Sequence, residues 1–139
     1  MAIRVASGTG YLSRSISAVS AYTVLLRVRM QTGEAEGLNL FSIENAGFTA
    51  YDYVYIEPNG TIHAGTQASD VSTGPGAIPD NTWVTIAIRR SGSELICVVT
   101  ETGAGVANTS TTQSGLVNVS LLGFAGMPSQ PARDIRALK

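Results

Sequence analysis

The stretch 22–30, YTVLLRVRM, decides the fold of this chain. Its side chains alternate between a mostly apolar set and a more polar set. Successive side chains of a β-strand point to opposite faces of the sheet, so this period of two predicts a strand with one core face and one wetter face. The core face takes Tyr22, Val24, Leu26, Val28 and Met30, and the wetter face takes Thr23, Leu25, Arg27 and Arg29.

The same alternation recurs outward along the chain, between short turn signals. The sequence PNG at 58–60 predicts a tight turn, because Pro presets φ and Asn-Gly tolerates a positive φ. A second turn, at 90–93, also joins two alternating stretches, so we expect hairpins over 51–66 and 83–100. Many short strands without a helical period predict an all-β fold, either a sandwich of two sheets or a barrel. The predicted strands cover 22–30, 38–44, 51–57, 61–66, 83–89, 94–100, 116–124 and 134–138.

Two stretches with few bulky residues interrupt this pattern. Residues 67–81 are rich in Ser, Asp, Gly, Pro and Asn, which predicts a loop long enough to carry function. Residues 101–115 are rich in Gly, Ala, Thr and Ser, which predicts an exposed arm or loop. If the protein binds neighbouring protein subunits, we expect both stretches and both termini to contribute contacts.

Length and composition limit the classes of function. A chain of 139 residues is expected to form one domain, over 1–139. The net charge is −1 and no basic stripe is present, so we expect no nucleic-acid partner. No stretch approaches the roughly 20 apolar residues of a membrane span, so we expect no membrane partner. Residues 1–8 lack the basic and apolar segments of a secretory signal, so we expect the protein to stay in the cytoplasm where it is made.

Two single residues are predicted to lie in the core. Cys97 is the one cysteine, which excludes a disulfide within the chain, and it sits in an apolar run. Trp83 begins an alternating strand, and we expect it to be buried. Replacing a core Trp with Ala costs about 3–5 kcal/mol of stability.

Three short segments, in order along the chain, carry a family resemblance: GTGYL at 8–12, DNTWVTIA at 80–87 and DIRAL at 134–138. They resemble the opening turn, the Trp strand and the closing strand of laminin-G-like jelly rolls, which belong to the concanavalin A-like lectin and glucanase superfamily. The resemblance implies a jelly-roll β-sandwich of two antiparallel sheets. The stretch 98–101, VVTE, departs from the family because it lacks the Asn/Asp-Gly turn that often follows the Trp strand.

A catalytic set of residues is not evident. Glucanases of this superfamily place acidic residues two to four apart on one strand. Asp52 and Glu57 are five apart, so strand alternation sends them to opposite faces and they cannot form an acid and nucleophile pair. Glu34 and Glu36 lie among glycines in a loop, where no rigid scaffold would hold them. His63 is the single histidine and is expected to be structural, so we expect no enzymatic activity.

A metal site is not expected either. Calcium takes six to eight oxygen ligands, usually with several carboxylates. Asp70, Asp80 and Asn81 flank the 67–81 loop, and three residues without tight spacing fall short of that set. We therefore expect no metal and no cofactor.

A row of tyrosines is the most distinctive surface feature. Tyr51, Tyr53 and Tyr55 share one face of a predicted strand. Such a row suits stacking against a sugar, and equally suits a protein interface or packing against a loop or the other sheet. Together with Asp70 and Asp80, the three tyrosines form the candidate surface for partner contact or glycan stacking.

Two functions of different classes fit these observations. The first is a structural virion protein, a capsid cement (decoration) protein of a tailed phage, favoured by the charge-poor composition and the missing catalytic set. In that role it would bridge and stabilise neighbouring copies of the major capsid protein on the outer surface of the virion, as a homodimer. The alternative is a lectin-like carbohydrate-binding module, favoured by the superfamily resemblance and by the tyrosine row.

Overall fold

This computed structural model describes residues 2–5, 12–30, 38–109, 111–121 and 133–137. These residues contain twelve strands, joined by turns and loops. Within these residues there is no helix of the length and hydrophobicity that crossing a membrane requires. The strands are β1 Ala2–Val5, β2 Leu12–Val19, β3 Tyr22–Arg29, β4 Leu38–Asn45, β5 Tyr51–Ile56, β6 Ile62–Thr66, β7 Asp70–Ser72, β8 Trp83–Ser91, β9 Glu94–Val99, β10 Gly105–Asn108, β11 Leu116–Leu121 and β12 Arg133–Ala137.

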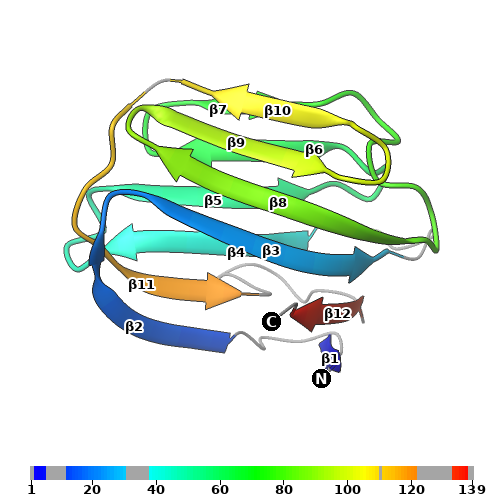
Figure 1. Cartoon of the computed structure of the whole chain (residues 1–139), viewed down its shortest axis with the longest axis horizontal. Coiled ribbons are helices and arrows are strands. Elements are labelled where there is room, and N and C mark those ends of the chain that lie inside the picture. The colour runs from blue at the N-terminus through cyan, green and yellow to red at the C-terminus, as the bar shows by residue number, and fades with distance from the viewer. Residues whose placement is uncertain (1, 6–11, 31–37, 110, 122–132, 138–139) are drawn as a thin grey trace.

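The strands form two antiparallel sheets of six strands each. Sheet I has the order β1-β12-β3-β8-β9-β10, and sheet II has the order β2-β11-β4-β5-β6-β7. Figure 1 shows the sheets stacked face to face, with β3, β8 and β9 over β4, β5 and β6. The first and last described strands, β1 and β12, pair with each other. The predicted all-β sandwich of two antiparallel sheets is confirmed.

The alternation read in 22–30 is confirmed in β3. Leu26, Val28 and Met30 are buried, whereas Thr23, Leu25 and Arg27 are exposed. β3 pairs with β8 over its whole length, so both strands bury every second residue against sheet II.

Two expectations about loops were wrong. The 67–81 loop contains β7, which pairs with β6, and the 101–115 arm contains β10, which pairs with β9. In the second stretch Val106, Asn108 and Gln113 are buried. Short edge strands take their hydrogen bonds from a neighbouring strand, so their own sequences need no strong apolar pattern.

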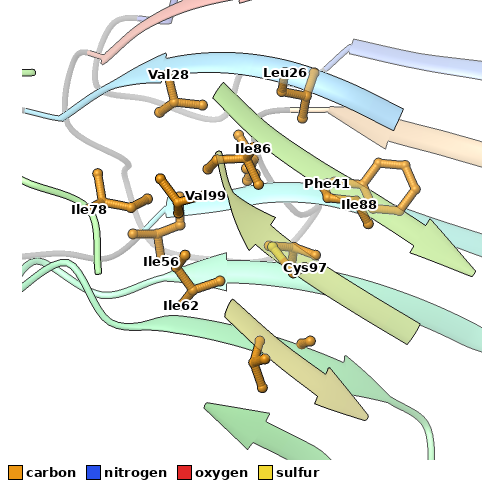
Figure 2. Close-up of a cluster of buried hydrophobic side chains, with 14 of the residues drawn as sticks. Leu26, Val28, Phe41, Ile56, Ile62, Ile78, Ile86, Ile88, Cys97 and Val99 are labelled. Carbon is orange, nitrogen blue, oxygen red and sulfur yellow. The ribbon is translucent and has the colours of Figure 1, made fainter. Parts of the chain in front are cut away.

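The core fills the space between the sheets (Figure 2). Burying a large apolar side chain contributes about 1.5–3 kcal/mol. Cys97 is buried as predicted, and burial raises the pKa of its thiol to about 12, so the thiol stays protonated at neutral pH. The largest buried apolar side chains are Phe41, Leu38, Leu40, Ile43, Ile56, Ile62, Ile86, Ile88, Leu95, Leu116 and Val28.

Trp83 is not in the core, so that prediction was wrong. β8 turns Val84 inward, and alternation therefore places Trp83 on the outer face of sheet I, where it is half-buried. The guanidinium carbons of Arg27 and Arg29 lie 5.9 Å and 5.5 Å from its ring centroid. These distances are within the range of cation–π attraction.

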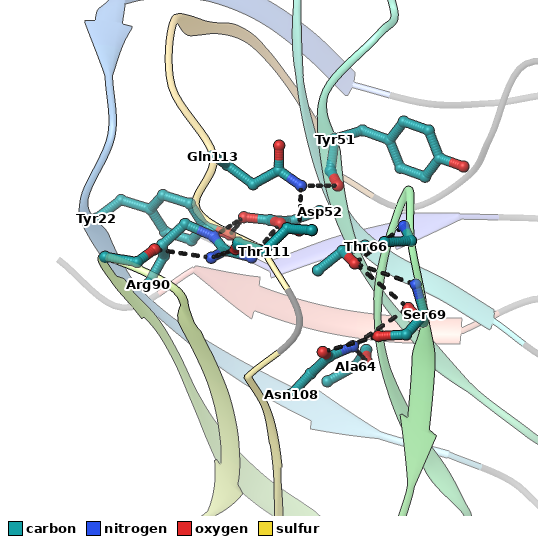
Figure 3. Close-up of polar contacts among 12 residues, drawn as sticks. Tyr22, Tyr51, Asp52, Ala64, Thr66, Ser69, Arg90, Asn108, Thr111 and Gln113 are labelled. Atoms are coloured by element: carbon teal, nitrogen blue, oxygen red, sulfur yellow. Dashed lines mark hydrogen bonds and ion pairs between the residues drawn. The ribbon is translucent and has the colours of Figure 1, made fainter.

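A buried ion pair joins the two sheets at one end of the sandwich (Figure 3). Arg90 of β8 donates from Nε and Nη2 to the two carboxylate oxygens of Asp52 on β5, and both side chains are fully buried. Tyr22 Oη donates to Asp52 Oδ2 at 2.7 Å. Arg90 Nη1 donates to the carbonyls of Gly92 at 3.0 Å and Thr111 at 2.9 Å. Burial, and then the Asp52 carboxylate, raise the pKa of Tyr22 far above its usual range.

A second polar contact joins the sheets through Asn108 of β10. Its Nδ2 donates to the carbonyls of Ala64 at 2.9 Å and Ser69 at 3.2 Å, and its Oδ1 accepts from Ser69 Oγ at 3.0 Å. Figure 3 shows these bonds beside the β6–β7 turn. β10 is therefore tied to the hairpin of β6 and β7 in sheet II.

The turn after β9 leads to a prediction of how the stability of the protein depends on pH. Glu101 accepts from the Thr85 backbone N–H at 2.6 Å, from Thr85 Oγ1 at 2.9 Å and from Thr100 Oγ1 at 2.8 Å. These hydrogen bonds lower the pKa of Glu101 to about 2, and the bond from the Thr85 backbone N–H has the largest effect. A lowered folded-state pKa contributes stability above the unfolded-state pKa, and that contribution is lost as pH falls toward 2.

We therefore expect Glu101→Gln to lower the urea midpoint of unfolding at pH 7. Between about pH 4.5 and pH 2 the midpoints of the variant and the wild type should converge. Urea titrations at pH 7, 4 and 2 check this, with Glu94→Gln as the control. If the difference in urea midpoint between Glu101→Gln and the wild type stayed constant with pH, the lowered pKa of Glu101 would be contradicted.

Candidate functional site

The outer face of sheet II carries the predicted tyrosine row. Tyr51, Tyr53 and Tyr55 are half-buried on β5, whereas Asp52, Val54 and Ile56 between them are buried against the core. This confirms the predicted alternation. The rings of Tyr51 and Tyr53 lie side by side, with centroids 6.4 Å apart and ring planes inclined by 32°. Together they offer a nearly continuous aromatic surface.

Gly65 of β6 lets the Tyr53 ring lie flat on the sheet. Tyr53 and Gly65 are direct cross-strand partners. A Cβ on Gly65 would come within 1.9 Å of Tyr53 Cζ, so the ring occupies the place where another residue would have its side chain. Burial, the Asp70 carboxylate and a hydrogen bond to it raise the pKa of Tyr53. The position of the ring is therefore set by its strand and by the absence of a side chain at Gly65.

A cluster of His63, Glu57 and Asp70 adjoins the tyrosines. His63 Nε2 lies 3.1 Å from Glu57 Oε1, and His63 Nδ1 lies 2.9 Å from Asp70 Oδ2. The rings of His63 and Tyr55 meet edge to face at 5.6 Å. The sequence analysis named no partner for His63, and the fold brings it two carboxylates, from 6 positions upstream and 7 positions downstream in the chain.

The turn between β5 and β6 positions Glu57. Gly60 N–H donates to the Glu57 carbonyl at 2.9 Å, and Glu57 N–H donates to the Thr61 carbonyl at 2.9 Å. Gly60 has φ +82°, and a Cβ there would meet the Ile78 carbonyl at 2.4 Å. The predicted PNG turn is confirmed, and its glycine serves both the turn and the close approach of the following loop.

Polar residues continue this face toward β4 and β11. The cross-strand partners of Tyr51, Tyr53 and Tyr55 on β4 are Glu44, Ser42 and Asn39. Burial raises the pKa of Glu44. The pairing register therefore places these three polar residues beside the tyrosines, with Glu44 half-exposed and Ser42 and Asn39 buried. Farther along the same rows, Ser15 Oγ donates to Asn118 Oδ1 at 3.0 Å.

The candidate surface is only partly assembled. Asp70 joins the tyrosines, but Asp80 does not belong to this face. The Asn81 N–H donates to the Met30 carbonyl at 2.6 Å, which places Asp80 beside the end of β3 in sheet I. Among the described residues, no three His, Cys, Asp or Glu side chains are arranged to hold a metal ion. The residues 8–11, Glu34 and Glu36 lie outside the described residues.

Sequence comparison finds no matching family model and no matching curated protein. Solved structures are similar in fold. The CBM40 module of the Ruminococcus gnavus IT-sialidase, bound to α2,3-sialyllactose, has a TM-score of 0.64 at 16% identity, covering 99% of this chain and 91% of that one. A toad ovary galectin in complex with thio-digalactose has a TM-score of 0.60 at 7% identity, covering 91% and 99%. Domains LG4–5 of the mouse laminin α1 chain have a TM-score of 0.61 at 15% identity, covering 92% and 39%.

These likenesses show the fold. The chain is a jelly-roll sandwich of two antiparallel sheets, the fold that the motif resemblance implied.

Proposed function

We propose that this protein is a non-catalytic carbohydrate-binding module whose binding face is the outer face of sheet II. The observation that carries the proposal is the Tyr53 ring lying across Gly65, with the Tyr51 ring beside it. The face of an aromatic ring is electron-rich and attracts the C–H groups on one side of a sugar ring. The carboxylates of Glu57 and Asp70, which are partly exposed next to that surface, can accept hydrogen bonds from sugar hydroxyls.

Two structures of the same fold support this proposal because each was solved with a bound sugar. The CBM40 module was solved with sialyllactose and the toad galectin with thio-digalactose. With identities of 16% and 7%, they show that this fold accommodates sugars, and the tyrosine face of this chain carries the rest of the proposal.

The capsid cement function stays a prediction, and we rank it second. None of the three structures described above is a virion protein. One of its premises has also changed, because the stretch 101–115, expected as a free arm for capsid contacts, contains a paired strand and buried side chains. The homodimer and the location on the virion remain parts of that prediction, and the composition of purified particles would test them.

Binding should depend on the position of the Tyr53 ring. We expect Tyr53→Ala to weaken binding to a recognised glycan by about tenfold, since an aromatic contact contributes about 0.5–1.5 kcal/mol beyond its buried area. Gly65→Ala should weaken binding to a similar degree although every tyrosine is retained, because the added Cβ displaces the ring. Calorimetric titration with ligands from a glycan array measures both effects.

The matched control for Gly65→Ala is Gly74→Ala. A Cβ on Gly74 meets no atom within 4 Å, so this variant should bind like the wild type. If the array detects no glycan, or if Tyr53→Ala and Gly65→Ala both bind normally, the proposed function is wrong.

A further inference from the structure

Arginine is distributed unequally between the two sheets. β1, β3, β8 and β12 of sheet I all contain arginine. Among the strands of sheet II, β4, β5, β6, β7 and β11 contain neither arginine nor lysine. Arginine is thus concentrated in the strands of the sheet that lacks the tyrosine row.

The one arginine in a described strand of sheet II, Arg14, does not belong to the row of residues that continues the tyrosine face. Arg14 of β2 pairs with Val119 of β11, which in turn pairs with Ile43 of β4. Ile43 is buried in the core, so alternation places this row on the inner side of sheet II, although Arg14 itself is exposed because β2 is an edge strand. Ser15, next along β2, belongs to the outward row with Asn118.

The charges on the tyrosine face itself are negative. Glu44, Glu57 and Asp70 lie on it or at its edge. His63 is its one basic side chain among the described strands, and both ring nitrogens already face carboxylate oxygens. Even with both nitrogens protonated, the imidazolium carries one positive charge against two carboxylates. No free cation is therefore available to a ligand on the described part of this face.

We propose that the glycan bound on this face is uncharged, an inference that rests on the proposed function. The carboxylate or sulfate of an acidic sugar would lose water on binding without gaining a guanidinium or ammonium partner. It would also approach three carboxylates of like charge. A neutral sugar has neither penalty, and its hydroxyls can donate to those same carboxylates. This ligand class differs from the sialylated ligand held by the CBM40 module of the same fold.

Matched pairs of glycans test the inference. The probes are neutral oligosaccharides and the same oligosaccharides carrying a terminal sialic acid or a sulfate group, compared by titration of the whole protein. We expect the acidic member of each pair to bind at least about tenfold more weakly than the neutral member. Binding of the neutral member should change little between 50 mM and 500 mM salt, because no ion pair forms.

The outcomes separate the two proposals. If no glycan of either kind binds, the proposed function fails. If acidic members bind as tightly as neutral ones or more tightly, the module binds glycans and the inference of a neutral ligand is overturned.

A charge variant tests the cause. Glu44→Gln removes one of the carboxylates beside Tyr51, so the difference in affinity within each pair should narrow by a few-fold. Glu94→Gln, on β9 of sheet I, is the control and should leave the difference unchanged. If Glu44→Gln left the affinity difference between neutral and acidic glycans unchanged, the electrostatic origin of the selectivity would be contradicted.

Discussion

Replacement of Arg90 by methionine is expected to lower the free energy of unfolding by about 3–5 kcal/mol. The reason is the state of Asp52 rather than the strength of the ion pair. Without Arg90, the Asp52 carboxylate stays fully buried and keeps only the hydroxyl of Tyr22 as a partner among the contacts described here. The carbonyl of Thr111 loses its donor as well, so the crossover from β10 to β11 is less firmly held. Denaturant titration monitored by fluorescence measures the change.

The neighbouring arginine provides the control. Arg89 is exposed on the outer face of sheet I, and Arg89→Met should change stability by no more than about 0.5 kcal/mol. Arg90→Lys keeps the charge but loses the paired geometry, so it should lie between the wild type and Arg90→Met. Removing the buried carboxylate too, in Arg90→Met/Asp52→Leu, should recover part of the loss. Equal effects of Arg89→Met and Arg90→Met would contradict this account.

Phe41→Ala is expected to cost about 3–5 kcal/mol, and Trp83→Ala clearly less. Phe41 is 1% exposed between the sheets, and its ring lies 5.5 Å from that of Tyr22. Truncating it leaves a cavity in the core. Trp83 is half-buried on the outer face of sheet I, so its removal leaves no enclosed cavity and gives up contacts with Arg27 and Arg29 instead. Thermal or denaturant unfolding of the two variants measures the difference.

Phe48 is the matched control for Phe41. Its side chain is 66% exposed in the turn between β4 and β5, where its φ is +56°. Phe48→Gly should be neutral or slightly stabilising, because glycine adopts that φ without strain. Should Trp83→Ala prove as costly as Phe41→Ala, the outer position of Trp83 would be contradicted.

The tyrosine face shows how far sequence reasoning extends to a site. Alternation alone put Tyr51, Tyr53 and Tyr55 on one face, because strand period is a local property. The contacts of His63 were not predicted, since they depend on a turn and on β7 bringing Glu57 and Asp70 to one place. The role of Gly65 also depends on register, because only the pairing of β5 with β6 sets it opposite Tyr53.

The buried ion pair has a local signal in the sequence. Extending the alternation of Val84, Ile86 and Ile88 by one step puts Arg90 on the core face. The same alternation in β5 puts Asp52 with Val54 and Ile56. Two opposite charges at core-facing positions would have indicated a buried partner for each. Their direct contact still required knowing that β8 and β5 face each other across the sandwich.

The sequence by itself determined the all-β sandwich, its longer strands other than β2, the PNG turn and the buried Cys97. These depend on periodicity and turn chemistry, which act over a few residues. Only the tertiary structure decided the strands β7 and β10, the outer position of Trp83, the Arg90–Asp52 pair and the platform of Tyr53 on Gly65. These depend on which strands become neighbours, and pairing between distant segments is set by the packing of the whole core.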